Sequence, residues 1–260
     1  MLKKLIKYDL IWVNKSMSTF FIIALIISTL TRISSNFTSS FVGNIIYLIL
    51  KGLTIGILVS LMINCIIRIW VRFRLNLYKD ESYLTHTLPV KKQTLYNSKI
   101  ISSIISLLIS SLVILICIVV AFFDQSMIDR IKDIFNQSGS SIVFISVIIT
   151  MLLELFYATL CGIIGLVIGH KSNNGKMPKS IIVGILLYFA IQFISFIVII
   201  AVGLANENMR GLFNNQMAND LNFETAVKTL EITMNLVYTV FIIGLYFVGE
   251  KLFKKGVNVD

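Results

Sequence analysis

The residues that could do chemistry are few and form no catalytic set. Histidine occurs only at His86 and His170, and the sequence contains neither the HExxH pattern of zinc proteases nor the GxSxG pattern of serine hydrolases. Cys65, Cys117 and Cys161 each lie in an apolar run, with no partner at metal-ligand spacing. The phosphate-binding pattern GxxxxGK followed by Ser or Thr is also absent. We therefore expect no enzyme activity, no metal site and no cofactor on this chain.

One carboxylate deserves a functional hypothesis because of its surroundings. Glu154 is the only ionisable residue deep inside a long apolar run, where a charged group is costly in a membrane. It could line a translocation path together with Tyr157, or it could relay protons. The alternative is a packing residue that is protonated or hydrogen-bonded at a subunit contact, helped by Tyr157 and Thr159.

The composition predicts long apolar helices, one of which would position Glu154. Of 260 residues, 57% are hydrophobic and 14% are charged, and the mean hydropathy is +0.88, whereas soluble domains carry about a quarter charged residues. We expect an all-α membrane protein with six spans, each of about 20 apolar residues or more. The predicted spans are residues 17–33, 43–70, 100–123, 140–169, 180–204 and 230–253.

The basic residues indicate topology rather than nucleic-acid binding. They lie at the ends of apolar runs and form no basic face interleaved with aromatic residues, although the net charge is +10. Segments 1–16, 68–99, 170–179 and 250–260 together hold 17 of the 23 Lys and Arg residues. This excess predicts a multi-pass protein of the cell membrane with both termini in the cytoplasm.

Two further elements and three seams of small residues are predicted. Residues 1–16 have apolar residues at helical spacing and form an amphipathic helix in the membrane interface, unless they are an ordinary basic lead-in to the first span. Residues 124–139 form a short amphipathic helix on the outer side. Small residues at helical spacing predict close helix packing within a bundle or a dimer; they are Gly52, Gly56, Ser102, Ser106, Ser110, Gly165 and Gly169.

The longest run without an apolar block is Tyr78–Lys99, within the predicted cytoplasmic loop 71–99. Its acidic start and its apolar residues predict a short helix at about Lys79–Thr87. Pro89 forces a turn because proline disfavours a helical residue before it. A second helix then begins at about Gln93 and leads into the third span. We interpret the loop as a compact cytoplasmic knob rather than a solvated connector, because its Tyr and Leu side chains would otherwise be exposed without purpose.

This loop resembles that of a known transporter family. The run YLTHTLPVKKQTLYNSK, residues 83–99, is similar to the cytoplasmic loop of type-2 ATP-binding-cassette (ABC) transporter permeases, in the bacterial exporter-like group. The family has a Leu-Thr-Leu-Pro-Val-like core, then basic residues, then a Ser-Lys pair that opens the third span. The Gly-rich end of the fourth span, FYATLCGIIGLVIGHK, also resembles the family, and the topology matches across nearly the whole chain.

The resemblance implies a permease subunit of an ATP-driven exporter of peptide antibiotics, drugs or lipids. Two permease chains, identical or different, would pair in the bilayer, and separate ATPase subunits carrying ATP and Mg would dock below. The helix before Pro89 would be the coupling helix that fits a groove on the ATPase, with Asp80 and Glu81 pairing with its basic groups. The implied coupling residues are Asp80, Glu81, Tyr83, Leu84, Thr87, Leu88 and Pro89.

Two other classes of function stay open at this point. The chain could be a substrate-binding or immunity membrane protein that holds a ligand without an ATPase. It could instead be a proton-coupled secondary carrier that uses Glu154. The residues do not distinguish a peptide, a drug or a lipid as the transported substrate.

Overall fold

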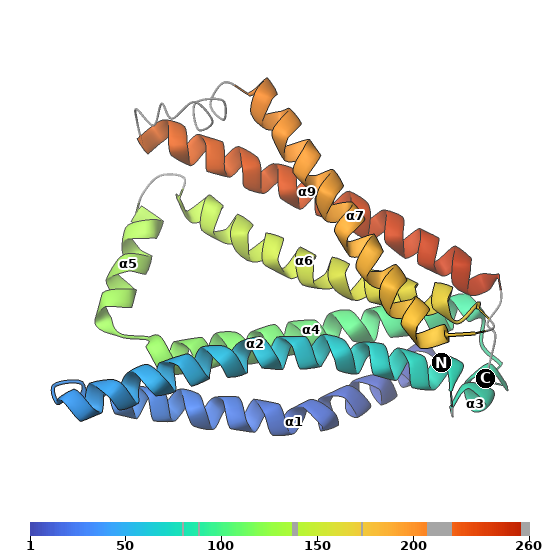
Figure 1. Cartoon of the computed structure of the whole chain (residues 1–260), viewed down its shortest axis with the longest axis horizontal. Coiled ribbons are helices and arrows are strands. Elements are labelled where there is room, and N and C mark those ends of the chain that lie inside the picture. The colour runs from blue at the N-terminus through green and yellow to red at the C-terminus, as the bar shows by residue number, and fades with distance from the viewer. Residues whose placement is uncertain (80, 88, 137–139, 173, 207–219, 256–260) are drawn as a thin grey trace. The chain divides into compact units, whose positions relative to one another are not determined.

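Helices account for almost all of the regular structure. The computed structural model describes residues 1–79, 81–87, 89–136, 140–172, 174–206 and 220–255, and no strand occurs among them (Figure 1). The prediction of an all-α protein with six apolar helices long enough to span a membrane is confirmed. The elements in chain order are α1 (Leu2–Ser34), η1 (Ser35–Phe37), α2 (Phe41–Tyr78), α3 (Ser82–Thr87), α4 (Lys92–Phe122), α5 (Gln125–Asn136), α6 (Ser140–Gly169), α7 (Lys176–Ala205) and α9 (Asp220–Lys254).

The first helix differs from its predicted form. Residues 1–16 are not a separate amphipathic helix, because α1 continues without a break from Leu2 to Ser34. No proline or glycine interrupts this stretch, and its buried face runs through Asp9, Val13 and Met17 across the predicted boundary. At 33 residues, α1 is roughly 50 Å long and exceeds the roughly 30 Å of a bilayer core.

The chain folds as two compact units, and residues 1–129 form the first. Here α1, α2 and α4 pack on one another, and α3 packs on α2 (Figure 1). Small polar residues fill the contacts: Thr31 and Thr54 hydrogen-bond across α1 and α2 at 2.7 Å. The Ser110 hydroxyl of α4 donates to the Cys65 sulfur of α2 at 3.1 Å. Such contacts suit a membrane, where apolar burial between helices gives little driving force.

The predicted serine seam of α4 is part of this packing. Ser102, Ser106 and Ser110 are all buried. Ser102 donates to the Lys99 carbonyl of its own helix at 2.9 Å. The carbonyl of Ser106 accepts a hydrogen bond from the Cys65 thiol at 3.7 Å.

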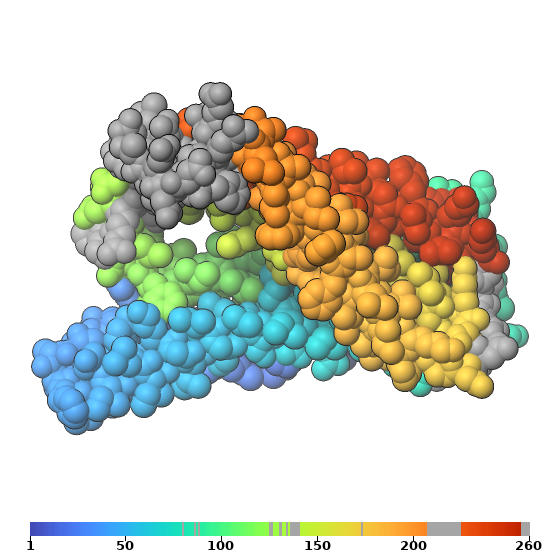
Figure 2. Space-filling model, turned by 45° about the horizontal axis from the view of Figure 1, so that its top comes forward, coloured from blue at the N-terminus to red at the C-terminus, as the bar shows by residue number. Residues whose placement is uncertain are grey.

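The second unit, residues 130–258, is built from α6, α7 and α9. Figure 2 shows α7 (orange) and α9 (red) side by side over part of their length. Gly165 and Gly169 pack against α7 as predicted: a Cβ at Gly165 would lie 2.5 Å from the Ser180 carbonyl oxygen, and one at Gly169 would lie 2.1 Å from the Ser180 hydroxyl. Only glycine permits this approach of the two backbones.

The glycine pair of α2 behaves differently. Gly52 and Gly56 are exposed, and a Cβ at either position would meet nothing within 4 Å. These two glycines therefore contact no other helix among the described residues, and their packing in a dimer stays a prediction. Leu53 and Ile55 on the same stretch are also exposed, so this stretch contacts another described helix only on its opposite face, through Thr54.

Two predictions concern the connections between spans. The amphipathic helix predicted at 124–139 is confirmed as α5, Gln125–Asn136. The resemblance to the transporter family also implies a possible membrane-dipping segment between the fifth and sixth spans, at residues 205–229, and most of it, residues 207–219, lies outside the described part of the chain.

Candidate functional site

The short helix α3 presents two different faces. Ser82 and Thr85 are 3% and 5% exposed and face the rest of the unit, whereas Tyr83 and Leu84 are 76% and 68% exposed. In the sequence, these two residues come after the end of α2 and before the start of α4, so they lie outside both apolar spans. This exposed tyrosine and leucine outside the spans make the outer face of α3 a candidate interaction surface.

Two of the other predicted coupling residues, Thr87 and Pro89, lie at the end of α3 and just after it. Pro89 is exposed and follows α3, and α4 begins at Lys92, close to the predicted start at Gln93. Thr87 is exposed and its hydroxyl donates to the Leu84 carbonyl of its own helix at 2.9 Å. Asp80 and Leu88 lie outside the described residues.

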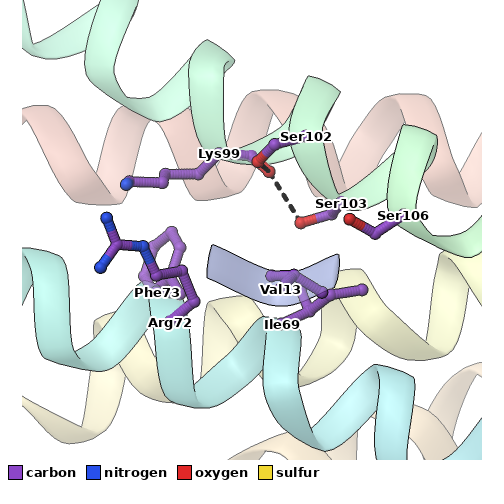
Figure 3. Close-up of a pocket in the computed structure, with 8 residues that line it drawn as sticks. All are labelled: Val13, Ile69, Arg72, Phe73, Lys99, Ser102, Ser103 and Ser106. Atoms are coloured by element: carbon purple, nitrogen blue, oxygen red, sulfur yellow. Dashed lines mark hydrogen bonds between the residues drawn. The ribbon is translucent and has the colours of Figure 1, made fainter. Parts of the chain in front are cut away.

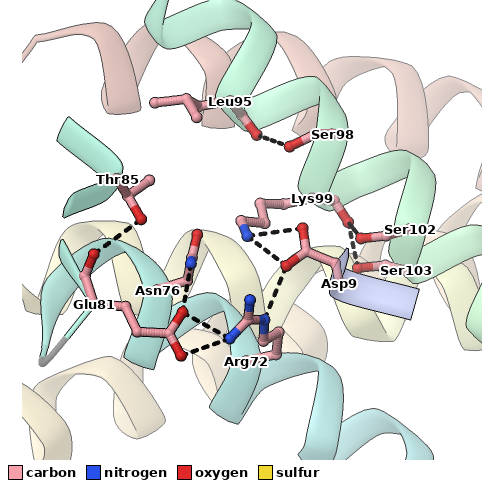
Figure 4. Close-up of polar contacts among 10 residues, drawn as sticks. All are labelled: Asp9, Arg72, Asn76, Glu81, Thr85, Leu95, Ser98, Lys99, Ser102 and Ser103. Carbon is pink, nitrogen blue, oxygen red and sulfur yellow. Dashed lines mark hydrogen bonds and ion pairs between the residues drawn. The ribbon is translucent and has the colours of Figure 1, made fainter. Parts of the chain in front are cut away.

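Beneath α3, three charged side chains from three helices meet in the interior. Asp9 of α1 is 2% exposed, and its carboxylate accepts hydrogen bonds from Arg72 Nε of α2 at 2.8 Å and from Lys99 Nζ of α4 at 2.7 and 2.8 Å (Figure 4). A buried carboxylate held by two cations is stable only when hydrogen bonds offset the loss of hydration. Asp9 therefore ties α1 to both α2 and α4.

Glu81 connects α3 to the same group. Both of its carboxylate oxygens accept from Arg72 Nη1, at 2.9 and 2.8 Å, and one also accepts from Asn76 Nδ2 at 2.8 Å. Arg72 thus holds Glu81 from within the chain, and the expectation that Glu81 also pairs with a basic group on a partner stays a prediction. Its carbonyl accepts the Thr85 hydroxyl at 2.9 Å, which fixes the first turn of α3.

We define the buried charge cluster as Asp9, Arg72, Glu81 and Lys99. Its positive and negative charges are balanced. It contains two carboxylates and two cations, so its formal charge is zero. Partial burial raises the pKa of Glu81, but the hydrogen bond from Asn76 and the charge of Arg72 outweigh this effect, so the pKa lies below its ordinary value. The Arg72 guanidinium also lies 5.4 Å from the Trp12 ring centroid, in cation–π range.

A cavity of about 10 Å³ adjoins the cluster, which is space for about one water molecule and not for a transported substrate. It is enclosed by side chains of α1, α2 and α4 and lies beside the Ser106 hydroxyl, which is buried without a hydrogen-bond partner. Figure 3 shows the lining residues: Val13, Ile69, Arg72, Phe73, Lys99, Ser102, Ser103 and Ser106. The cluster therefore suits a mechanical role better than substrate binding.

Sequence reasoning missed Asp9 and Arg72 as parts of a site. It treated residues 1–16 only as an amphipathic segment, without assigning a role to Asp9, and counted Arg72 only among the basic residues that indicate topology. One signal was present: Asp9, Val13 and Met17 recur every four residues, so Asp9 continues the buried stripe of α1. Which cations would meet it depends on helices far apart in the sequence, and spacing alone could not show that.

The second unit contains the other predicted site, Glu154 and Tyr157 of α6. Glu154 accepts hydrogen bonds from the Tyr188 hydroxyl at 3.1 Å and from Gln192 Nε2 at 3.2 Å, both on α7. The Tyr157 hydroxyl donates to the Tyr188 carbonyl at 2.6 Å, and its ring stacks on those of Tyr188 and Tyr238. The two predicted residues thus lie in one polar, aromatic group within the spans.

The part of the chain that the structure describes contains no group of three or more His, Cys, Asp or Glu side chains able to hold a metal ion. Comparisons of the sequence and structure with protein-family models, with curated proteins and with solved structures found no match. The function of the chain is therefore inferred from its own residues and their contacts.

Proposed function

We propose that this chain is the membrane-spanning permease subunit of an ATP-driven exporter of the type-2 ABC class. Six apolar helices are consistent with a membrane transport protein. In this proposal both termini lie in the cytoplasm of a bacterial cell, a second permease chain completes the translocation path, and a separate ATPase subunit carries ATP and Mg. The likeness of residues 83–99 to the loop of that family supports the class.

The observation that carries the proposal is the two-faced character of α3. Its outer face offers Tyr83 and Leu84, which suit an apolar groove on a soluble partner, as an aromatic anchor does at many protein interfaces. Its inner face is held by Glu81, which Arg72 and Asn76 bind together. A helix that merely connected two spans would need neither the exposed apolar pair nor the ionic support.

The buried charge cluster would transmit a movement of α3 to the membrane spans. A push on α3 would act through Glu81 on Arg72 of α2, and Arg72 shares Asp9 of α1 with Lys99 of α4. Because these contacts are short and charge-assisted, the four elements move together rather than slide. ATP-driven closure of two ATPase subunits could thus reorient three spans of each permease.

The test is purification of the tagged chain in mild detergent from membranes of its own cells. We expect the preparation to contain a second polypeptide with a Walker-type nucleotide loop and to hydrolyse ATP. The double variant Tyr83→Asp, Leu84→Asp should lose this polypeptide and the ATP hydrolysis, because two carboxylates would need to enter an apolar groove.

The matched control is Phe37→Asp, which changes an aromatic residue of 61% exposure in η1, between the other ends of α1 and α2. It should retain the second polypeptide. Equal retention by the α3 double variant, or a preparation with no nucleotide-binding polypeptide at all, would refute the docking role of α3.

The hydrogen-bonded Glu154 favours one second candidate, a secondary carrier driven by protons. This carrier would transport without ATP and would stop when Glu154 is replaced by Gln. Transport by Glu154→Gln at the wild-type rate would exclude it.

A further inference from the structure

A column of polar side chains runs along one face of α6 in the second unit. Ser146, Thr150 and Glu154 are four residues apart, so they lie above one another on the helix. Thr150 donates to the Glu231 carboxylate of α9 at 2.7 Å. Asn235 Nδ2 of α9 donates to the Ser146 hydroxyl at 2.9 Å. The column thus faces α9 and starts near the first residue of α6.

The column ends near the middle of the spans, in an aromatic group. Gln192 of α7 donates to Glu154 and accepts from the Tyr238 hydroxyl of α9 at 3.3 Å. The ring of Tyr157 lies between those of Tyr188 and Tyr238, with centroid distances of 5.2 and 5.6 Å. Three tyrosine rings and a carboxylate therefore meet at one depth.

The two carboxylates of the column have no oppositely charged partner among the residues that the structure describes. Neither Glu154 nor Glu231 takes part in an ion pair among the described residues. Both donors to Glu154 reach Oε1, and Oε2 has no hydrogen bond from the described residues. Unpaired carboxylates at such positions are costly in a membrane and mark substrate or ion pathways.

A second observation concerns a buried hydroxyl on α7. The hydroxyl of Ser195 on α7 is buried, at 1% exposure, and has no hydrogen-bond partner in the described structure. Ser195 lies three residues beyond Gln192 and seven beyond Tyr188, so all three share one face of α7. This unpartnered hydroxyl is therefore directed into the same interior as the column.

From these features we infer that the column binds the positively charged group of an organic cation, so that the exporter proposed above transports cationic amphiphiles. The claim that the chain transports such cations rests on the proposed function, whereas the claim that it binds them does not. Carboxylates supply the opposite charge, and the electron-rich tyrosine rings attract an ammonium-like group. A bare metal ion fits less well, because the described residues offer no group of three acidic, His or Cys ligands.

The first test is binding of a radiolabelled lipophilic cation, tetraphenylphosphonium, to the full chain in nanodiscs of neutral phosphatidylcholine. We expect saturable binding, and none for tetraphenylborate, which has the same shape and the opposite charge. Glu154→Gln and Glu231→Gln should each weaken cation binding about tenfold, as expected for loss of one charge-assisted contact. Unchanged binding in Glu154→Gln, or equal binding of the two probes, would overturn the inference.

The control variant is Glu250→Gln on α9. Glu250 is also buried but is paired with Lys254, so its replacement should leave cation binding unchanged. A tenfold loss in this variant would show that any carboxylate change on α9 affects the assay, and would count against the inference.

A measurement on the unaltered chain avoids any folding defect of the variants. Dicyclohexylcarbodiimide, which modifies carboxyl groups within membranes, should label Glu154, as located by mass spectrometry. Tetraphenylphosphonium should protect Glu154 and tetraphenylborate should not. Labelling that the cation leaves unaffected would indicate a site for protons alone and would overturn the inference.

These assays contain no ATPase, so the two proposals fail separately. Cation binding without a nucleotide-binding partner would remove the exporter and leave the cation site. A nucleotide-binding partner with no cation binding would remove the site and leave the exporter.

Discussion

Asp9 has an importance that its place near the chain terminus does not suggest. It is the common acceptor for Arg72 and Lys99, which come from helices that are far from it in the sequence. Removing one member of a buried ion group usually costs more than the intact group contributes, because the remaining charges are left without partners. The stability of the first unit should therefore depend strongly on this one carboxylate.

We predict that Asp9→Asn destabilises the chain by about 3 kcal/mol or more, because two buried cations lose their counter-charge. The measurement is thermal unfolding in detergent, compared with Lys7→Gln, which changes an exposed charge on the same helix. Adding Lys99→Met to Asp9→Asn should restore part of the loss. A double variant less stable than Asp9→Asn alone would contradict this explanation.

The attachment of α3 should depend on pH through Glu81. Because its pKa in the folded protein lies below the ordinary value of 4.5, ionised Glu81 stabilises the fold above that pH. This contribution should be lost as the pH falls below 4.5 and through the folded pKa. The protection of the amides of residues 81–87 against hydrogen exchange, measured relative to their intrinsic rates at each pH, should then fall in the wild type.

In Glu81→Gln the protection of residues 81–87 should already be low at neutral pH and should change less on acidification. Equal pH dependence in the wild type and in Glu81→Gln would show that another group holds α3.

Helix contacts in this protein depend on what lies opposite each glycine. Gly165 and Gly52 both belong to GxxxG pairs, yet only Gly165 faces another backbone. The GxxxG pattern predicts that another helix can pack closely against this one, but it does not indicate whether another helix does so. The length of α2 was similarly underestimated, because a stretch with charged residues such as Arg72 extends the helix beyond its apolar run.

We predict that Gly165→Ala destabilises the second unit by about 1–3 kcal/mol, since the added methyl group would overlap the backbone of α7. Gly56→Ala, the matched change on α2, should leave the melting temperature unchanged or slightly raised, because alanine favours a helix. Thermal unfolding of both variants in detergent tests this contrast. Equal melting temperatures for the two variants would mean that the α6–α7 contact can adjust.

The arrangement of the whole chain in the membrane follows mainly from composition. Six apolar helices were predictable because each needs only a long run of apolar residues, which a sequence displays directly. Tyr83, Leu84 and Glu154 were predictable as candidates because each is out of place in its own segment. The buried charge cluster was not, because its members become neighbours only after the helices pack.

We predict that α3 lies on the cytoplasmic side. The three native cysteines are at most 1% exposed, so a cysteine introduced at position 84 should react with an impermeant maleimide over a low background. Leu84→Cys should be labelled in inside-out vesicles and not in intact cells, and Asp129→Cys in α5 should show the reverse. Labelling of both variants from the same side would contradict the six-span topology.

The central claim is that the outer face of α3 contacts a nucleotide-hydrolysing subunit. The most direct measurement is photo-crosslinking in native membranes, with a benzophenone amino acid at position 84 and, as the control, at position 37. We predict a light-dependent adduct from position 84, and none from position 37, to a polypeptide that contains a Walker-type loop. Adducts from position 84 that contain only lipid, this chain or a protein without a nucleotide site would contradict the claim.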